Sequence, residues 1–137
     1  MSFVARAESA GGMGFDIDLQ GHKLRVDADP AFGGTNSGPR PKSLLLAGLA
    51  GCTGMDVVSI LGKMRMPFDS FAVEVDADTA EEHPKVYTRV HLRYIFSGAA
   101  LDRAKIEKAV RLSMDTYCGV TATLRHTADI DYEIVTE

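Results

Sequence analysis

Two cysteines, Cys52 and Cys118, are the residues of this sequence best suited to redox or nucleophilic chemistry. They lie far apart in the chain, which excludes a zinc site of the paired C-x-x-C type, and two cysteines are too few for a disulfide-rich scaffold. In a reducing compartment a stable structural disulfide is not expected, so each is either a buried small hydrophobe or a reactive thiol. Two thiols so far apart in sequence can still meet in the folded chain.

Cys52 lies well inside an apolar segment, where burial raises the pKa of a thiol. Asp56, four residues later, reaches the same face of a helix and disfavours the thiolate further. Spacing alone therefore favours a packed structural cysteine. Reactivity requires a cation from another segment, for which Arg40, Lys42 and the strand arginines are the candidates.

Cys118 stands in the run DTYCGV, where a helical pattern gives way through Gly119 to a strand-like carboxyl end. This pattern predicts a turn at Cys118. A mobile turn suits a thiol that attacks an oxidised partner, and plain burial in the turn is the alternative.

Other candidate sites are weaker. In the loop FGGTNSGPRP, Gly33 and Gly38 have the spacing of a phosphate-binding loop, but Pro39 stands where lysine is needed. Proline also removes N–H donors, so we expect this loop to direct the chain into the following helix. The four histidines are scattered without ligand spacing, and a metal site would have to be assembled wholly by tertiary contacts. No metal site is predicted.

The composition fits one globular domain over residues 1–137, with 45% hydrophobic and 25% charged residues and a net charge of −4. A pI near 5.5 and the lack of a long Lys/Arg tract argue against nucleic-acid or anionic-membrane binding. The amino-terminal MSFVARAES has no apolar run of signal-peptide length, so we expect a cytoplasmic protein.

The segment from Leu44 to Leu61 has the length of a membrane span, but Asp56 and three glycines weaken that reading. We predict instead a helix of a soluble protein that begins near Pro41 and ends before Pro67. A helix with no polar face must be covered on nearly all sides.

Period-two alternation predicts strands around this helix. One runs from Phe71 to Ala77, and EEHP turns the chain into a second strand, Lys85 to Phe96, with Thr88 on its inner face and Tyr87 outside. A helix from Leu101 to Tyr117, capped by Asp102, and a strand at 130–134 follow. Short strands near residues 3–8, 14–19 and 23–28 complete an α+β fold with antiparallel sheets around a long central helix.

Three features resemble the superfamily of osmotically inducible protein C and organic hydroperoxide resistance proteins (OsmC/Ohr). The first is GGTNSGPRPKSLLLAGLAGCTGMDVVSILGKMR (33–65), the second is YCGVTATLRHTADIDYEI (117–134), and the third is the order of elements. GCTGMDVVSIL is similar to a less-characterised OsmC-like branch.

The resemblance implies an OsmC-like fold in an intertwined homodimer, with Cys52 as peroxidatic and Cys118 as resolving cysteine. It implies reduction of an organic hydroperoxide by a sulfenate and disulfide cycle, a lipoyl-type dithiol as reductant, and no metal, flavin or haem. The glutamate expected about ten positions before Cys52 is replaced by Pro41, Lys42 and Ser43, and the expected early arginine by Met13. The candidates for a substitute cation are Arg6, Arg25, Arg40 and Lys42.

The leading hypothesis is therefore a thiol-dependent peroxidase. One alternative is a non-catalytic module that binds a small hydrophobic ligand in an apolar interface pocket. Another is a thiol redox sensor that forms the disulfide but turns over too slowly to detoxify.

Overall fold

The computed structural model describes residues 4–137, and their contacts divide the chain into two compact units, Met1–Leu45 and Leu46–Glu137. That residues 1–137 make one domain stays a prediction. The α+β class and the long central helix are confirmed.

The first unit is built on a three-stranded antiparallel sheet of order β1-β2-β3, with β1 at Ala5–Ser9, β2 at Phe15–Leu19 and β3 at His22–Val26. The three short strands predicted here are confirmed with small shifts at their ends; residue 3 lies outside the described residues. One face of the sheet is charged and carries ion pairs between Asp18 and Lys23 (2.6 Å) and between Asp16 and Arg25 (2.6 Å).

Asp27 organises the loop that follows β3. Its Oδ2 accepts hydrogen bonds from the backbone N–H and hydroxyl of Ser37 and of Thr35, and its Oδ1 accepts one from the N–H of Ala28. The bonds from Ser37 have the largest influence and hold the pKa of Asp27 well below its usual range. The backbone N–H groups of Ala28, Thr35 and Ser37 are thus directed at this carboxylate.

Two glycines let this loop close on itself. A Cβ on Gly34 would collide with the backbone of Ala28, and one on Gly38 would collide with the backbone of Arg25. Only glycine therefore fits at these two positions. Two short 3-10 turns flank these glycines, Pro30–Phe32 before them and Pro41–Ser43 after them, and the second leads directly into the long helix.

The second unit contains most of helix α1 (Leu44–Lys63) and a sheet of order β4-β5-β6, with β4 at Ser70–Thr79, β5 at Tyr87–Ser97 and β6 at Asp129–Thr136. Strands β4 and β5 form the predicted antiparallel hairpin. Strand β6 pairs parallel with β5, so this sheet is mixed and the prediction of antiparallel sheets is wrong for this pair. The pairing is parallel because the helical segment between the two strands carries the chain back across the sheet.

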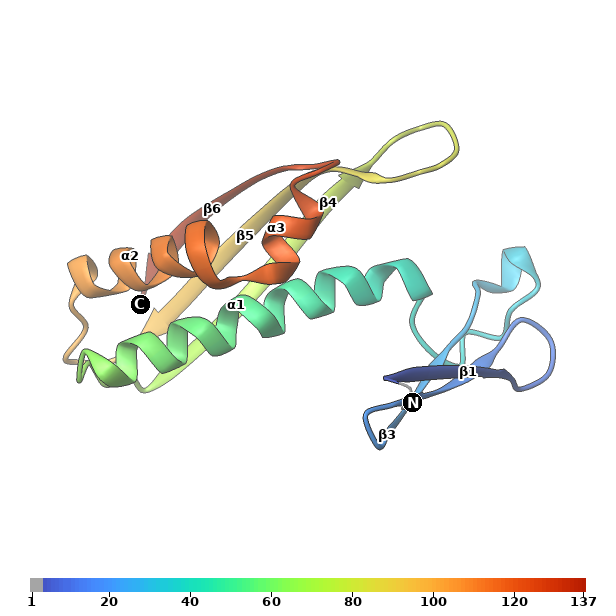
Figure 1. Ribbon diagram of the computed structural model, residues 1–137, viewed down its shortest axis with the longest axis horizontal. Helices are drawn as coiled ribbons and strands as arrows, with labels where there is room; N and C mark the ends of the chain where they lie inside the picture. The colour runs from blue at the N-terminus through green and yellow to red at the C-terminus, as the bar shows by residue number, and fades with distance from the viewer. Residues whose placement is uncertain (1–3) are drawn as a thin grey trace. The chain divides into compact units, whose positions relative to one another are not determined.

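That helical segment comprises α2 (Arg103–Leu112), a π-helical turn (Ser113–Tyr117) and α3 (Gly119–Leu124). Asp102 caps α2 as predicted, accepting from the N–H groups of Ala104 and Lys105. Helix α3 was not predicted from the sequence, whose pattern indicates a turn and then a strand at these positions. Figure 1 shows α1, α2 and α3 over one face of the sheet formed by β4, β5 and β6. The core between them includes Leu49, Val57, Leu61, Val90, Leu92, Tyr94, Phe96, Ile106 and Val110.

The inner face of β5 differs from the prediction at its start. The pairing of β4 with β5 shifts at Thr79, which lies opposite Tyr87 while Asp78 lies opposite Arg89. Thr88 is the extra residue of this bulge. Tyr87 is therefore buried and Thr88 exposed, the reverse of the predicted alternation, since a bulge breaks the period of two.

Helix α1 is only partly covered by its own chain. Among residues 4–137, the segment Pro41–Lys63 is the one helix long and apolar enough to cross a membrane by length and composition. It buries Leu49, Thr53, Val57 and Leu61 in the second unit. Met55 is 75% exposed and Val58 47% exposed, so one apolar face has no cover.

The opposite face of the second sheet carries a network of charged side chains. Nδ1 of His91 lies 2.6 Å from Asp131 and its Nε2 lies 2.8 Å from Glu133, while Arg93 contacts Glu133 and Glu74. The hydrogen bond to Asp131 and then that to Glu133 raise the pKa of His91 above its ordinary value.

This raised pKa predicts a pH-dependent stability. Protonated His91 stabilises the fold fully below the unfolded pKa of about 6.5, and the contribution is lost as pH rises through the higher folded pKa. The urea midpoint should therefore fall between about pH 6 and pH 8.5, and less so in His91→Gln. His126→Gln, at an exposed histidine, should keep the wild-type slope. Parallel curves for wild type and His91→Gln would contradict the prediction.

Candidate functional site

The fold brings Cys52 and Cys118 together. The two sulfur atoms and a carboxylate oxygen of Asp56 all lie within 4.8 Å of one another. Cys52 and Asp56 come from successive turns of α1, and Cys118 comes from the start of α3. Both cysteines are free thiols in this structure.

The junction between the π-helical turn and α3 fixes Cys118. Its backbone N–H donates to the carbonyl of Ser113 (2.8 Å), which closes the π-helical turn, and its sulfur accepts from the N–H of Thr121 (3.4 Å). Cys118 is therefore the N-cap of α3 and is 3% exposed. The predicted turn is a single residue between two helical segments.

Cys52 is partly buried, and its surroundings favour the thiol over the thiolate. Burial has the largest influence and raises its pKa; the hydrogen bond with Cys118 and the negative charge of Asp56 act in the same direction. A hydrogen bond from the backbone N–H of Val120 opposes them. None of these groups is a cation. The raised pKa of Cys52 agrees with the effect of burial and of Asp56 predicted from the sequence.

A chain of buried hydroxyl groups ends at Asp56. Ser113 Oγ donates to Asp56 Oδ2 (2.9 Å), Thr53 Oγ1 lies 2.7 Å from Ser113 Oγ, and Tyr94 Oη lies 2.7 Å from Thr53 Oγ1. A carboxylate only accepts and each hydroxyl has one hydrogen, so Tyr94 donates to Thr53, Thr53 to Ser113, and Ser113 to Asp56. This chain ties α1, β5 and the π-helical turn together behind the thiols.

The sequence does not predict this chain of hydroxyl groups, because its members are polar residues scattered over three segments. Thr53 and Ser113 at positions that otherwise carry apolar core residues were the available signal. Both are completely buried, as is Tyr94. Burial raises the pKa of the Tyr94 hydroxyl above its ordinary value. The hydroxyl therefore keeps its proton and serves as the donor to Thr53.

We expect Thr53→Val to lower the free energy of unfolding by about 1–3 kcal/mol. Valine keeps the shape but leaves the buried Tyr94 hydroxyl without its acceptor. Thr53→Ser, which keeps the hydroxyl, is the matched control and should cost less. Urea denaturation measures both, and an equal loss for the two variants would contradict the role assigned to the hydroxyl.

The four cations proposed from the sequence, Arg6, Arg25, Arg40 and Lys42, all lie in the first unit, whereas Cys52 lies in the second. The described contacts of the arginines are also in the first unit: Arg6 with Glu8, Arg25 with Asp16 and Ser37, and Arg40 with Asn36, Gly38, Asp27 and Asp29. An activating role for any of the four stays a prediction.

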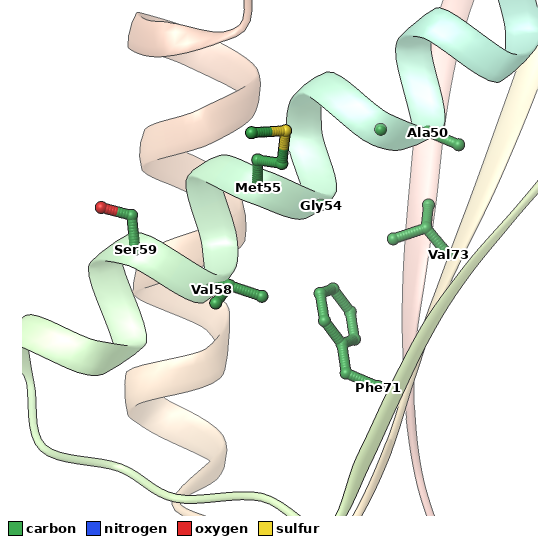
Figure 2. A pocket seen from close by; sticks show the side chains of 8 residues that line it. Ala50, Gly54, Met55, Val58, Ser59, Phe71 and Val73 are labelled. Carbon is green, nitrogen blue, oxygen red and sulfur yellow. The ribbon is translucent and has the colours of Figure 1, made fainter.

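An apolar groove of about 580 Å³ lies between α1 and β4. Figure 2 shows Val58, Phe71 and Val73 turned toward one space, and Met55 of α1 also lines the groove. Successive residues of a helix are about 100° apart around its axis. Cys52 and Asp56 therefore lie on one side of the buried residues Thr53 and Val57, and Gly54 and Val58 lie on the other side. The groove and the thiols are therefore on different sides of the helix.

Residues 34–133 match the family model described as OsmC-like protein. The chain is 32% identical over 117 residues to Protein YhfA of Escherichia coli K12, covering 84% of each chain. A solved hypothetical protein from Aquifex aeolicus has a TM-score of 0.82 at 26% identity, covering 100% of this chain and 99% of the other. An organic hydroperoxide resistance protein OsmC from Legionella pneumophila has a TM-score of 0.74 at 16% identity, covering 98% and 97%, a likeness of fold alone.

Proposed function

The chain belongs to the OsmC-like protein family, and from that premise we propose that it is a thiol-dependent peroxidase that reduces organic hydroperoxides. The observation that carries the proposal is the meeting of Cys52 and Cys118, whose sulfurs lie within 4.8 Å of each other. Solved proteins of the same fold include one described as an organic hydroperoxide resistance protein.

The proposed cycle uses only the two sulfurs. The Cys52 thiolate attacks the terminal oxygen of the hydroperoxide, the O–O bond breaks, and the alkoxide takes a proton and leaves as an alcohol. Cys52 is now a sulfenic acid. The Cys118 thiol attacks its sulfur, water leaves, and a disulfide forms. A small dithiol of the lipoyl type then reduces the disulfide, so one hydroperoxide and one dithiol yield alcohol, water and oxidised dithiol.

Two features of the site support the roles. Cys52 is the more accessible sulfur, since it is partly exposed while Cys118 is buried, and the attacking cysteine must meet the substrate. Cys118 caps α3 with its sulfur already within 4.8 Å of the Cys52 sulfur, so a small side-chain movement is enough to form the disulfide. Condensation also protects the sulfenic acid from further, irreversible oxidation.

The test combines turnover with thiol counting. Purified protein with dihydrolipoamide should consume an alkyl hydroperoxide well above the protein-free rate. Without reductant, one equivalent of hydroperoxide per chain should remove both thiols, and peptide mapping should find Cys52 joined to Cys118. Retention of both thiols after the peroxide pulse would overturn the proposal.

A slow redox sensor is the second candidate, favoured by the burial of Cys52 and by the nearby carboxylate of Asp56, both of which raise the pKa of the thiol. A sensor forms the same disulfide in the thiol count. A sensor differs from a peroxidase in turnover. With excess dithiol, its consumption of hydroperoxide would stay close to one equivalent per chain on the time scale of the peroxidase assay.

We also propose that the chain forms a homodimer in which a second copy covers the exposed face of α1. The face is apolar over Met55 and Val58 and is lined by small residues such as Gly51 and Gly54, which allow close approach of another helix. α1 is then the core helix of a soluble fold, and we expect the protein to act in the cytoplasm.

Met55→Asp tests the dimer. Because Met55 is 75% exposed in the single chain, a charge there should leave the fold of the subunit intact while weakening a dimer at least tenfold. Met55→Leu is the apolar control. Sedimentation across protein concentrations should give a wild-type dimer and a dissociating Met55→Asp. A monomeric wild type that retains a bound hydrophobic ligand would favour the ligand-binding alternative instead.

A further inference from the structure

The thiol pair and Asp56 form a set of donors that a metal ion would recognise. Of the acidic side chains on the sheet surface, Asp76, Asp78, Asp131 and Glu133 are already paired with Arg89, Arg93 or His91. By contrast, no ion pair described in residues 4–137 includes Asp56, whose described hydrogen bond comes from the neutral Ser113 hydroxyl. A carboxylate whose described contacts include no cation thus lies within 4.8 Å of two sulfurs.

From this arrangement we infer that Cys52, Asp56 and Cys118 bind a thiophilic divalent cation, with Zn²⁺ the best match. Zinc takes cysteine sulfur at about 2.3 Å and carboxylate oxygen at about 2.0–2.2 Å in tetrahedral geometry. Two sulfurs around one such ion are about 3.8 Å apart, so side-chain shifts of an ångström or less close the set. On binding, both thiols release their protons to water and the ligands are thiolates.

The surroundings of the donors fit this assignment. Ser113 holds Oδ2 of Asp56, which leaves Oδ1 on the same carboxylate to bind the ion. Backbone N–H groups of Thr121 and Val120 donate to the sulfurs of Cys118 and Cys52, as outer-shell donors do around metal-bound ligands. The spacing of Cys52 and Asp56, four residues apart on α1, puts two ligands on one helix face. Three protein ligands leave a fourth position for water.

The sequence predicted no metal, because the two cysteines are far apart in the chain and no histidine has ligand spacing. The site uses no histidine and is assembled by the tertiary contacts of α1 with the start of α3. A bound ion holds both sulfurs as ligands, so it excludes the disulfide and blocks attack by Cys52. Metal binding and the proposed redox cycle therefore compete for the same two atoms.

The probe is Co²⁺, added to reduced full-length protein and then displaced by Zn²⁺. We expect one Co²⁺ per chain with a thiolate-to-cobalt charge-transfer band, and at least tenfold weaker binding in Cys52→Ser and Asp56→Asn. Asp115→Asn, at an exposed aspartate outside the cluster, should bind as wild type does. Wild-type protein oxidised to the Cys52–Cys118 disulfide should lose the band, a result that needs no variant to fold.

Zn²⁺ should also protect the thiols of reduced protein from alkylation, and a chelator should restore their reaction. Absence of the charge-transfer band, or equal Co²⁺ binding by reduced and disulfide-oxidised protein, would overturn the metal site. That failure is distinguishable from failure of the peroxidase proposal, because chelator-treated protein would still form the disulfide with hydroperoxide. Protein that binds Co²⁺ but keeps its thiols in peroxide would fail the peroxidase proposal alone.

Discussion

Cys52→Ser is expected to abolish consumption of organic hydroperoxide, reducing the rate at least a hundredfold to that of the protein-free reaction. The serine hydroxyl has nearly the same size but is a far weaker nucleophile at neutral pH, and it forms no counterpart of the sulfenic acid. Cys118 remains in this variant, but it is 3% exposed and reaches the substrate poorly.

The measurement is the rate of loss of an alkyl hydroperoxide with excess dihydrolipoamide, at equal concentrations of the two proteins. Thermal unfolding of each protein checks that the substitution leaves the fold intact. Equal rates in the two proteins would refute the assignment of Cys52 as the attacking thiol. A rate that survives Cys52→Ser but is lost in Cys118→Ser would exchange the roles of the two cysteines.

Cys118→Ser is expected to keep the first reaction and lose the protection that follows it. Cys52 should still be oxidised by the first equivalent of hydroperoxide, and a sulfenic-acid trap should label it. With no second thiol to condense with, excess hydroperoxide should drive Cys52 to the sulfinic and sulfonic acids. The variant should therefore become inactive within a few turnovers.

Intact-mass measurement after peroxide treatment distinguishes the two proteins. The wild type should lose two hydrogens as it forms the disulfide, whereas Cys118→Ser should gain two or three oxygens. Because serine can still accept the bond from the N–H of Thr121, the start of α3 should be preserved. Recovery of full wild-type turnover through many cycles would show that Cys118 is not the resolving residue.

The sequence by itself determined most of the elements, though not α3, and the residues able to do the chemistry. Alternation of apolar and polar residues located the three short amino-terminal strands and the β4–β5 hairpin, since that period is a local property of the chain. The cap at Asp102 was equally local, as was the tendency of burial and of Asp56 to hold Cys52 as a thiol. The family resemblance supplied the pairing of Cys52 with Cys118.

Only the tertiary structure decided what surrounds these residues. The bulge that buries Tyr87 depends on the pairing of two strands, and the carboxylate of Asp27 is satisfied by residues up to ten positions away. The hydroxyl chain from Tyr94 to Asp56 joins three segments, none of which signals the other two. A site in which Asp56, and no described cation, faces two thiols follows from packing α1 against the start of α3. Contacts between residues distant in sequence produce no periodic or compositional pattern in the chain. These contacts decide whether the two sulfurs react with an oxidant, form a disulfide or bind a metal ion.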